Sequence, residues 1–178
     1  MKKLVFAFLA IAICTVIVSC NEQTAGTSDK AKKNLATNQA VLKMFENGDF
    51  SKIGDYIAKD AVDHSGPQGE VKGLDSIKAM FQYFTSSMSN TKVEVVKELA
   101  DDDYVMSWIK QNWTAKMDDP MMHMKSGDKG NMEGVDVTKY DADGKVIEHW
   151  GFISMTDMMK MMPQPTMEMN KMDTTGKK

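Results

Sequence analysis

The segment Met132–Ser154, MEGVDVTKYDADGKVIEHWGFIS, has the pattern of two β-strands joined by a tight turn. Asp141–Gly144 supplies the turn, because Asp side chains bond to the nearby backbone and Gly readily adopts the left-handed conformation. Apolar and polar residues alternate before the turn, as expected for a strand with two unlike faces. The segment therefore predicts a β-hairpin whose register decides which side chains share a wall.

The length of the turn decides that register. With a loop of four residues, Tyr140 pairs with Lys145, and Asp136 lies opposite His149 on the same face of the hairpin. With a loop of three residues, Asp136 faces Trp150 instead. We favour the first register, which predicts a carboxylate and an imidazole side by side on one wall.

The N-terminal segment and the charge of the chain indicate where the protein acts. Residues 1–20 have the charged start and short apolar core of a secretory signal, and Ile17–Cys20 resembles the bacterial lipobox, in which the cysteine receives a lipid. We expect lipidation at Cys20 and attachment to a membrane of the bacterial cell envelope, facing the periplasm or the surface. An ordinary signal with a chance cysteine is the alternative.

With a formal net charge of −3 and no basic stripe, the chain is not expected to bind nucleic acid.

The rest of the chain divides into three parts. The polar residues 21–33 predict a flexible tether, residues 34–163 a single domain, and residues 164–178 a disordered methionine-rich tail. Within the domain we expect three helices followed by four strands, which predicts an α+β fold with helices on one face of an antiparallel sheet. The expected helices begin near Leu35, after an N-cap at Ser51, and at Leu74; the strands cover about 91–100, 104–116 and the two arms of the hairpin.

Several motifs resemble the SnoaL-like polyketide cyclase family, within the nuclear-transport-factor-2-like superfamily, over about residues 34–163. The most specific are Asp136-Val137, Gly144-Lys145-Val146 and Glu148-His149-Trp150; weaker matches are Gly48-Asp49-Phe50, residues 60–64 and Gly73. The resemblance implies N-terminal helices packed on a strongly curved antiparallel sheet, forming a cone-shaped domain with a pocket. Gly151 departs from the family, in which this position is often acidic, and residues 118–131 carry an unusual Met-Met-His-Met insertion.

The resemblance also implies a role for Asp136, as a general acid or base on a small, apolar, carbonyl-bearing molecule that is rearranged or cyclised. A structural carboxylate is the alternative, and binding without catalysis also stays open. His149 is expected to share a proton with Asp136 or to orient it. Adjacent strand residues face opposite ways, so of Asp63 and His64 we expect only His64 to face inward. The aromatic residues expected to line the apolar pocket are Tyr104, Trp108, Trp113 and Trp150.

Two further functions are compatible with the sequence. The chain has 18 methionines, and thioethers suit Cu(I), so a methionine-rich copper-binding envelope protein is one alternative. Its candidate ligands are Met121, Met122, His123 and Met124. The other alternative is a ligand-free interaction module that forms a homodimer through Val135 and Val137 on the convex sheet face. No cofactor is expected.

Overall fold

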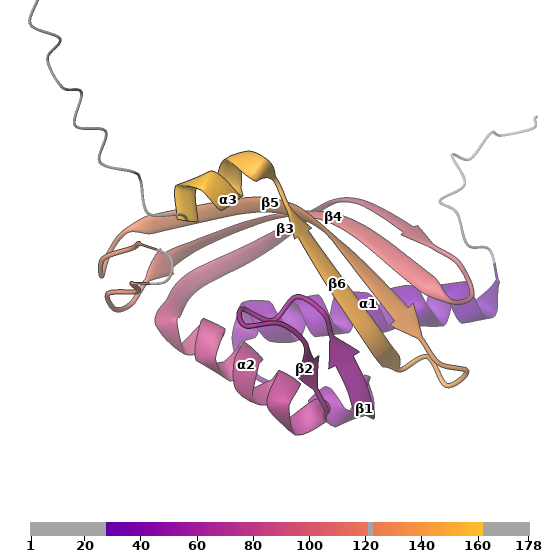
Figure 1. Cartoon of the computed structure of the whole chain (residues 1–178). Coiled ribbons are helices and arrows are strands. Elements are labelled where there is room, and N and C mark those ends of the chain that lie inside the picture. Colours follow the sequence, from indigo (N-terminus) through magenta and orange to yellow (C-terminus); the bar gives the residue numbers. More distant parts are fainter. Residues whose placement is uncertain (1–27, 121–122, 162–178) are drawn as a thin grey trace, which may run out of the picture.

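The computed structural model describes residues 28–120 and 123–161 (Figure 1). In chain order its elements are helix α1 (Asp29–Asn47), the 3-10 turn η1 (Ile53–Asp55), strands β1 (Ile57–Asp63) and β2 (Val71–Lys72), helix α2 (Leu74–Ser87), strands β3 (Met88–Ala100), β4 (Tyr104–Ala115), β5 (Lys129–Tyr140) and β6 (Val146–Ile153), and helix α3 (Met155–Met161). The expected α+β class is confirmed. The expected signal peptide, with its Cys20, and the methionine-rich tail lie outside the described residues. In the two described ranges, no helix is both long and apolar enough to cross a membrane.

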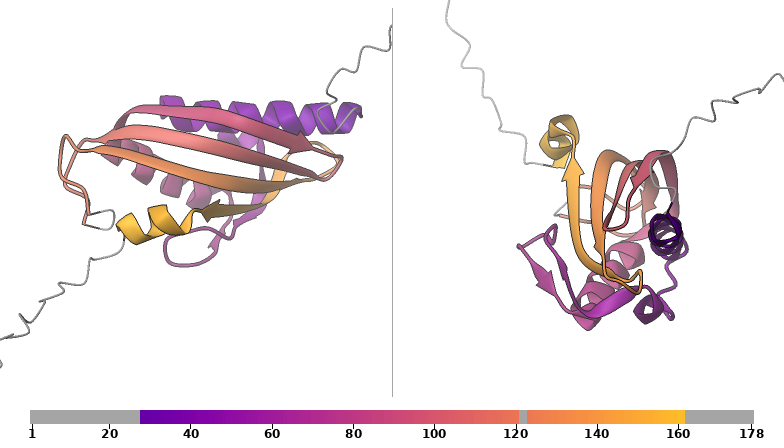
Figure 2. Two further views of the ribbon diagram at one scale, coloured as in Figure 1. Left: turned by 90° about the horizontal axis from the view of Figure 1, so that it is seen from above. Right: turned by 90° about the vertical axis from the view of Figure 1, so that its right-hand side faces the viewer.

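The six strands form one curved sheet in the order β2-β1-β6-β5-β4-β3. Neighbouring strands are antiparallel except β1 and β6, which run parallel. Both long helices lie on the same side of this sheet, α1 against β3 and β4 and α2 against β1 (Figure 2). The sheet therefore has an inner face covered by helices and an outer face that the helices leave open.

The core lies between the helices and the inner face. Along β4 every second residue is buried and the residues between are exposed or half-buried, which marks a strand with one covered face. The largest buried apolar side chains of the core come from the helix side and from the strands: Phe50, Ile53, Ile57, Ile77, Val105, Tyr140 and Val146. Burial of this kind is the main favourable contribution to folding.

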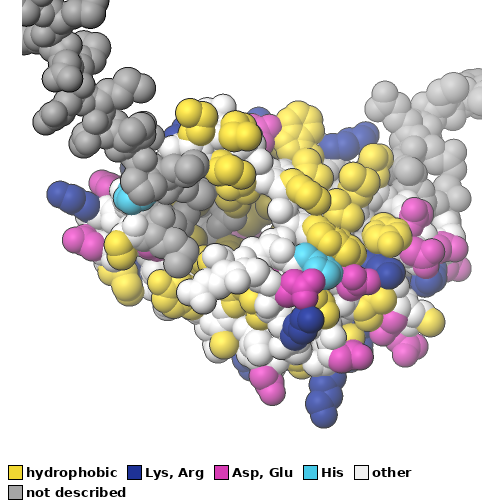
Figure 3. All heavy atoms as spheres, viewed as in Figure 1, with side chains coloured by type: hydrophobic (Ala, Val, Ile, Leu, Met, Phe, Trp, Pro, Cys, Tyr) yellow, Lys and Arg dark blue, Asp and Glu magenta, His cyan; other side chains and the backbone are white. Residues whose placement is uncertain are grey.

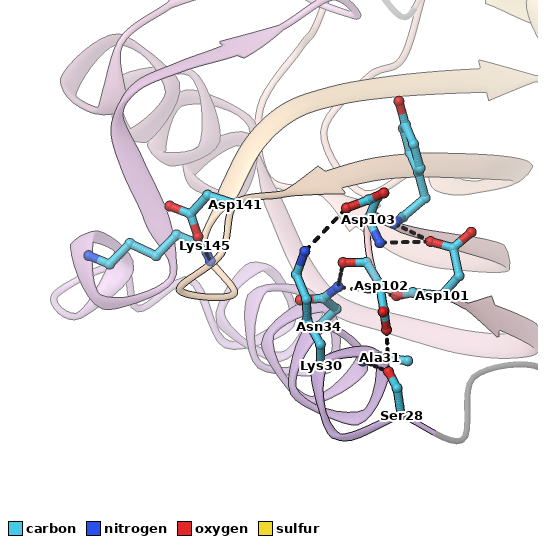
Figure 4. A network of polar contacts seen from close by, with 10 residues as sticks. Ser28, Lys30, Ala31, Asn34, Asp101, Asp102, Asp103, Asp141 and Lys145 are labelled. Carbon is cyan, nitrogen blue, oxygen red and sulfur yellow. Dashed lines mark hydrogen bonds and ion pairs between the residues drawn. The ribbon is translucent and has the colours of Figure 1, made fainter.

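Helix α1 begins earlier than the sequence suggested. Residues 29–33 were expected to belong to the flexible tether, but Ser28 caps the helix through its hydroxyl, which accepts a bond from the Ala31 amide. The Asn34 amide then donates to the carbonyls of Asp101 and Asp102 in the β3–β4 turn (Figure 4). The expected tether was wrong here because polar residues can form a helix when capping and tertiary hydrogen bonds hold its first turns.

The short helix expected after Ser51 is reduced to a single 3-10 turn, the three residues of η1. Strand pairing takes over directly afterwards. Ile57 pairs with Val146 of β6, and the Val146 amide donates to the Tyr56 carbonyl at 2.8 Å. Because local helix propensity is weak compared with pairing and burial, the segment joins the sheet.

The hairpin of β5 and β6 has a register that neither expected loop length produces. Asp136 pairs with Gly151, and His149 pairs with Thr138. The Asp141 side chain accepts a bond from the Lys145 amide at 2.8 Å, which closes a longer loop, and a β-bulge follows. The resulting shift from the favoured register is two residues, and a shift of two preserves the face. Asp136 and His149 are therefore diagonal neighbours on the inner face.

Candidate functional site

The inner face of the sheet and the two long helices line a cavity of about 550 Å³ that opens to solvent. Its wall is mostly apolar and includes Phe45, Phe81, Ile109 and Trp113. The charged side chains of the wall lie together, at the C-terminal end of β1 and the middle of β5 and β6. A cavity of this size and composition is typical of a site for a small organic molecule.

Three side chains from three strands meet on this polar part of the wall. His149 Nδ1 lies 3.0 Å from Asp63 Oδ2, and His149 Nε2 lies 3.5 Å from Asp136 Oδ1. We call these three residues the Asp-His-Asp cluster. The imidazole thus bridges two carboxylates, with the shorter contact to Asp63 and the longer one to Asp136.

Asp63 is the buried end of the cluster. Its side chain is only 3% exposed, against 24% for Asp136. The Ser65 amide donates to Asp63 Oδ1 at 2.7 Å, so one carboxylate oxygen binds backbone and the other binds His149. Burial acts to raise the pKa of Asp63, but the hydrogen bond and charge of His149, with the Ser65 amide, hold that pKa below its usual value. Asp63 is therefore an ionised anchor for the imidazole.

His149 is protonated at neutral pH. Burial by itself would lower the pKa of His149, but the hydrogen bonds and charges of Asp136 and Asp63 outweigh this effect and raise the pKa to about 10. An imidazolium has two N–H donors and no acceptor. One donor is used by Asp63 at normal hydrogen-bond distance, whereas the 3.5 Å contact leaves the Nε2 donor only loosely engaged by Asp136.

Gly151 of β6 lies directly beside the cluster. A Cβ atom at this position would lie 3.4 Å from Asp136 Oδ1 and 3.3 Å from the Ser65 hydroxyl. The Gly151 amide donates to that hydroxyl, which joins β6 to the segment after β1. The glycine thus stands where relatives often have an acidic residue, and a side chain here would crowd the Asp136 carboxylate and the Ser65 hydroxyl.

A second polar network joins helix α1 to the sheet, and its central residue, Asn38, also lines the cavity. The Asn38 amide of α1 donates to the Ser107 hydroxyl at 2.8 Å and to Glu98 at 3.0 Å, and the Tyr140 hydroxyl donates to Asn38 Oδ1 at 3.1 Å. Burial raises the pKa of Tyr140, so its phenol stays protonated. This network fixes α1 to the sheet and leaves the proton chemistry to the Asp-His-Asp cluster.

The expectation that His64 faces the cavity was wrong. Its ring stacks on Trp150 at a centroid distance of 4.7 Å, and its nitrogens lie 3.0 Å from Glu70 and 3.1 Å from Glu148. Neighbouring strand residues do face opposite ways, as expected, but Asp63 takes the inner position. Asp63 shares this inner face with Ala61, which belongs to the buried core.

The aromatic residues expected in the pocket divide between the two faces of the sheet. Trp113 lines the cavity, whereas Tyr104 and Trp108 are on the outer face and more than a third exposed. Trp150 stacks on His64 and also lies outside the cavity lining. The separation of Trp108 and Trp113 is five residues, and an odd separation puts two side chains of one strand on opposite faces.

The candidate copper ligands are only partly described. Met121 and Met122 lie outside the described residues, while His123 is exposed and Met124 forms a bridge to Asp119. Across residues 28–120 and 123–161, no three His, Cys, Asp or Glu side chains are grouped in a way that could hold a metal ion.

Solved structures of other proteins are similar to this chain in fold. A protein from a Jannaschia species that is assigned as a SnoaL-like polyketide cyclase is 17% identical to this chain. Its TM-score is 0.64, over 78% of this chain and 96% of that one. An LEH-like epoxide hydrolase of M. tuberculosis is 14% identical, with a TM-score of 0.60 over 75% and 86% of the two chains. Wild-type IdmH from Streptomyces antibioticus, assigned as a polyketide cyclase, is 19% identical, with a TM-score of 0.58 over 71% and 95%.

No protein with a curated description matches the chain. Likeness to these solved structures establishes the cone-shaped fold of the nuclear-transport-factor-2-like type. The sequence comparison is more specific, because the family model of the SnoaL-like polyketide cyclases matches residues 36–164. The chain therefore belongs to the SnoaL-like polyketide cyclase family.

Proposed function

We propose that this domain binds a small, apolar, carbonyl-bearing molecule in its cavity and transfers a proton with Asp136. The observation that carries the proposal is the Asp-His-Asp cluster on the wall of an otherwise apolar cavity of about 550 Å³. Clusters of titratable groups with altered pKa values in a cavity are typical of catalytic sites. Family membership favours chemistry at a carbonyl over other uses of such a cluster.

The cluster assigns different roles to its two carboxylates. Asp63 is buried and bound to backbone, so it is a positioning residue that keeps His149 protonated and oriented. Asp136 reaches the cavity and is held only by the longer contact, so it is the carboxylate that can exchange a proton with a ligand.

The proton transfer can be written with these groups alone. Asp136 removes a proton from the carbon next to the carbonyl; the C–H electron pair forms the enolate, and its negative charge moves to the carbonyl oxygen. The Nε2–H donor of His149 stabilises that oxygen, since its Nδ1 donor is used by Asp63. The enolate carbon then either regains the proton or attacks a second carbonyl of the same molecule. The attack forms the C–C bond that closes the ring, the π electrons of that carbonyl move to its oxygen, and the oxygen takes the proton from Asp136.

Exchange of α-protons for deuterium tests this proposal without knowledge of the natural substrate. Straight-chain methyl ketones and β-diketones are incubated with the protein in deuterated buffer, and exchange is followed by proton NMR. We expect Asp136→Asn to slow exchange by roughly a hundredfold or more. Asp60→Asn, the same change at an exposed position of β1, is the matched control and should leave exchange unchanged. If the wild-type protein neither binds nor exchanges any of these compounds, the enzyme proposal is wrong.

We also propose that the domain is attached to the cell envelope through a lipid on Cys20. The support is the charged and apolar order of residues 1–20, which ends in a lipobox-like sequence. Mass spectrometry of the protein purified from bacterial membranes should show an N-terminal peptide that begins with lipidated Cys20. Recovery of Cys20→Ala and wild type in the same soluble fraction would contradict this attachment.

A further inference from the structure

One of the polar side chains that line the cavity outside the Asp-His-Asp cluster is an amide on β4. Gln111 of β4 is only 6% exposed and lines the cavity. Its neighbours on the inner face are apolar: Val93 and Met132 are its partners across the sheet, and Ile109 and Trp113 are next along its own strand. Gln111 is thus a single amide in an apolar part of the wall.

The amide of Gln111 has no hydrogen-bond partner in the described part of the chain. The one buried side-chain atom there that lacks both a partner and contact with open space is Asn34 Oδ1. The Gln111 amide therefore borders the cavity rather than packed protein. Burying an amide without a partner is unfavourable, and native proteins rarely do so without a reason. A ligand that fills the cavity would supply the missing partner.

The position of Gln111 relative to the cluster indicates the shape of that ligand. Ser107 pairs with Asp136 across β4 and β5, and Gln111 lies four residues farther along β4. At the rise of a β-strand, this separation corresponds to roughly 13 Å along the sheet. The wall between the two positions is apolar on β4, where Ile109 projects inward.

We infer that Gln111 determines specificity by binding a second polar group of the ligand, at the end away from the reacting carbonyl. This inference rests on the function proposed above and defines its substrate class. The ligand is an elongated molecule with a carbonyl at one end, an apolar middle, and a hydroxyl or second carbonyl at the other. Because an amide both donates and accepts, it can bind either group.

Matched pairs of ligands test this inference. Straight-chain methyl ketones of eight, ten and twelve carbons, and the same ketones bearing a terminal hydroxyl, are titrated into the full-length protein by isothermal calorimetry. In the wild-type protein the hydroxyl should tighten binding by about three- to tenfold at the chain length that matches the spacing. In Gln111→Leu this gain should vanish, while the plain ketone should bind at least as tightly as before.

Asn112→Leu is the matched control, because it removes an amide at the next position of β4, on the outer face. It should keep the wild-type preference for the hydroxyl. The ligand-free Gln111→Leu protein should melt at the same temperature as wild type or higher, since no hydrogen bond is lost.

Four outcomes would overturn the inference. One is a wild-type protein that binds the plain and the hydroxylated ketones equally tightly. This result would leave the proposed function intact. Another is a preference for the hydroxyl that persists in Gln111→Leu, or a lower melting temperature for that variant. A wild-type protein that binds none of the ketones overturns the proposed function, and this inference with it.

Discussion

His149 is bound to Asp63 through Nδ1 at 3.0 Å, and Asp63 is itself held by the Ser65 amide at 2.7 Å. The imidazolium is therefore fixed from the buried side, by strand β1, rather than by its neighbour on the hairpin. This arrangement leaves Asp136 as the carboxylate that a ligand can reach. The roles of the two carboxylates can be separated by experiment.

Replacement of Asp63 by asparagine should lower the pKa of His149, because the charge of the nearer carboxylate is lost. The loss of one charge-assisted hydrogen bond, about 1.5 to 3 kcal/mol, predicts at least a roughly tenfold decrease in α-proton exchange. NMR titration of the His149 ring protons measures the first effect. A variant that loses exchange while His149 titrates as in wild type would show that Asp63 does not act through the imidazole.

The free energy of unfolding should depend on pH, because His149 and Asp63 of the cluster have altered pKa values. The pKa of His149 is raised from 6.5 to about 10, so its stabilisation is complete below pH 6.5 and is lost as the pH rises through about 10. The pKa of Asp63 is lowered, so its stabilisation is present above pH 3.8 and is lost as the pH falls further. Stability should therefore be greatest between these two limits.

Denaturant unfolding at a series of pH values measures this dependence. Wild type should lose roughly 2 kcal/mol or more between pH 6.5 and pH 10, and His149→Gln should show a much smaller decrease. His64→Gln, at the outer-face histidine, is the control and should keep the wild-type slope. Equal slopes for wild type and His149→Gln would mean that the imidazolium does not contribute.

Much of this site could be predicted from the sequence, because alternation along a strand fixes the face on which each side chain lies even when its partner on the next strand is not known. Asp136 and His149 share a wall although the hairpin register differs from both expected ones, since the shift from the favoured register is an even number of residues. The Asp141 cap and the bulge after Val146 set the true register, and neither follows from turn composition alone.

The parts that sequence reasoning missed are those that come from another strand. Asp63 reaches His149 through the parallel pairing of β1 and β6, and a contact of this kind depends on topology rather than on local pattern. Gln111 was not predicted as a pocket residue, because only the aromatic residues of its strand were considered for the pocket. The alternation of β4 places Ser107, Ile109, Gln111 and Trp113 on one face, and this signal was present in the sequence.

The cavity wall is tightly packed at its apolar end, where Gly130 lies against Trp113. A Cβ atom there would lie 2.2 Å from the ring of Trp113, which lines the cavity. Gly130→Ala must therefore displace the indole, and overpacking of this kind costs about 1 to 3 kcal/mol. We expect a melting temperature lower by roughly 3 to 10 °C and weaker binding of methyl ketones. Gly127→Ala is less informative as a control because its φ of 93° adds backbone strain, so Lys129→Ala, on the same strand, is preferred. An unchanged melting temperature would show that the indole is free to move.

The outer face of the sheet carries two apolar rows, one across four strands and one across three. Register places Leu99, Met106, Val137 and Trp150 in one row, and Trp108, Val135 and Phe152 in the next. Leu99, Met106, Trp108 and Phe152 are each more than two-fifths exposed. Hydrophobic side chains gather over these strands in Figure 3. A contiguous exposed patch of this kind is typical of a protein interface.

We therefore predict that the domain forms a homodimer through this face. A two-fold contact brings the same rows of both copies together, so one lysine in the patch is introduced twice at the interface. Sedimentation velocity should show a dimer for wild type and a monomer for Met106→Lys. Tyr83→Lys alters a side chain that is 55% exposed on α2, away from the sheet, and should leave the dimer intact. A monomeric wild type at all accessible concentrations would remove the dimer, whereas a dimer that survives Met106→Lys would place the contact elsewhere.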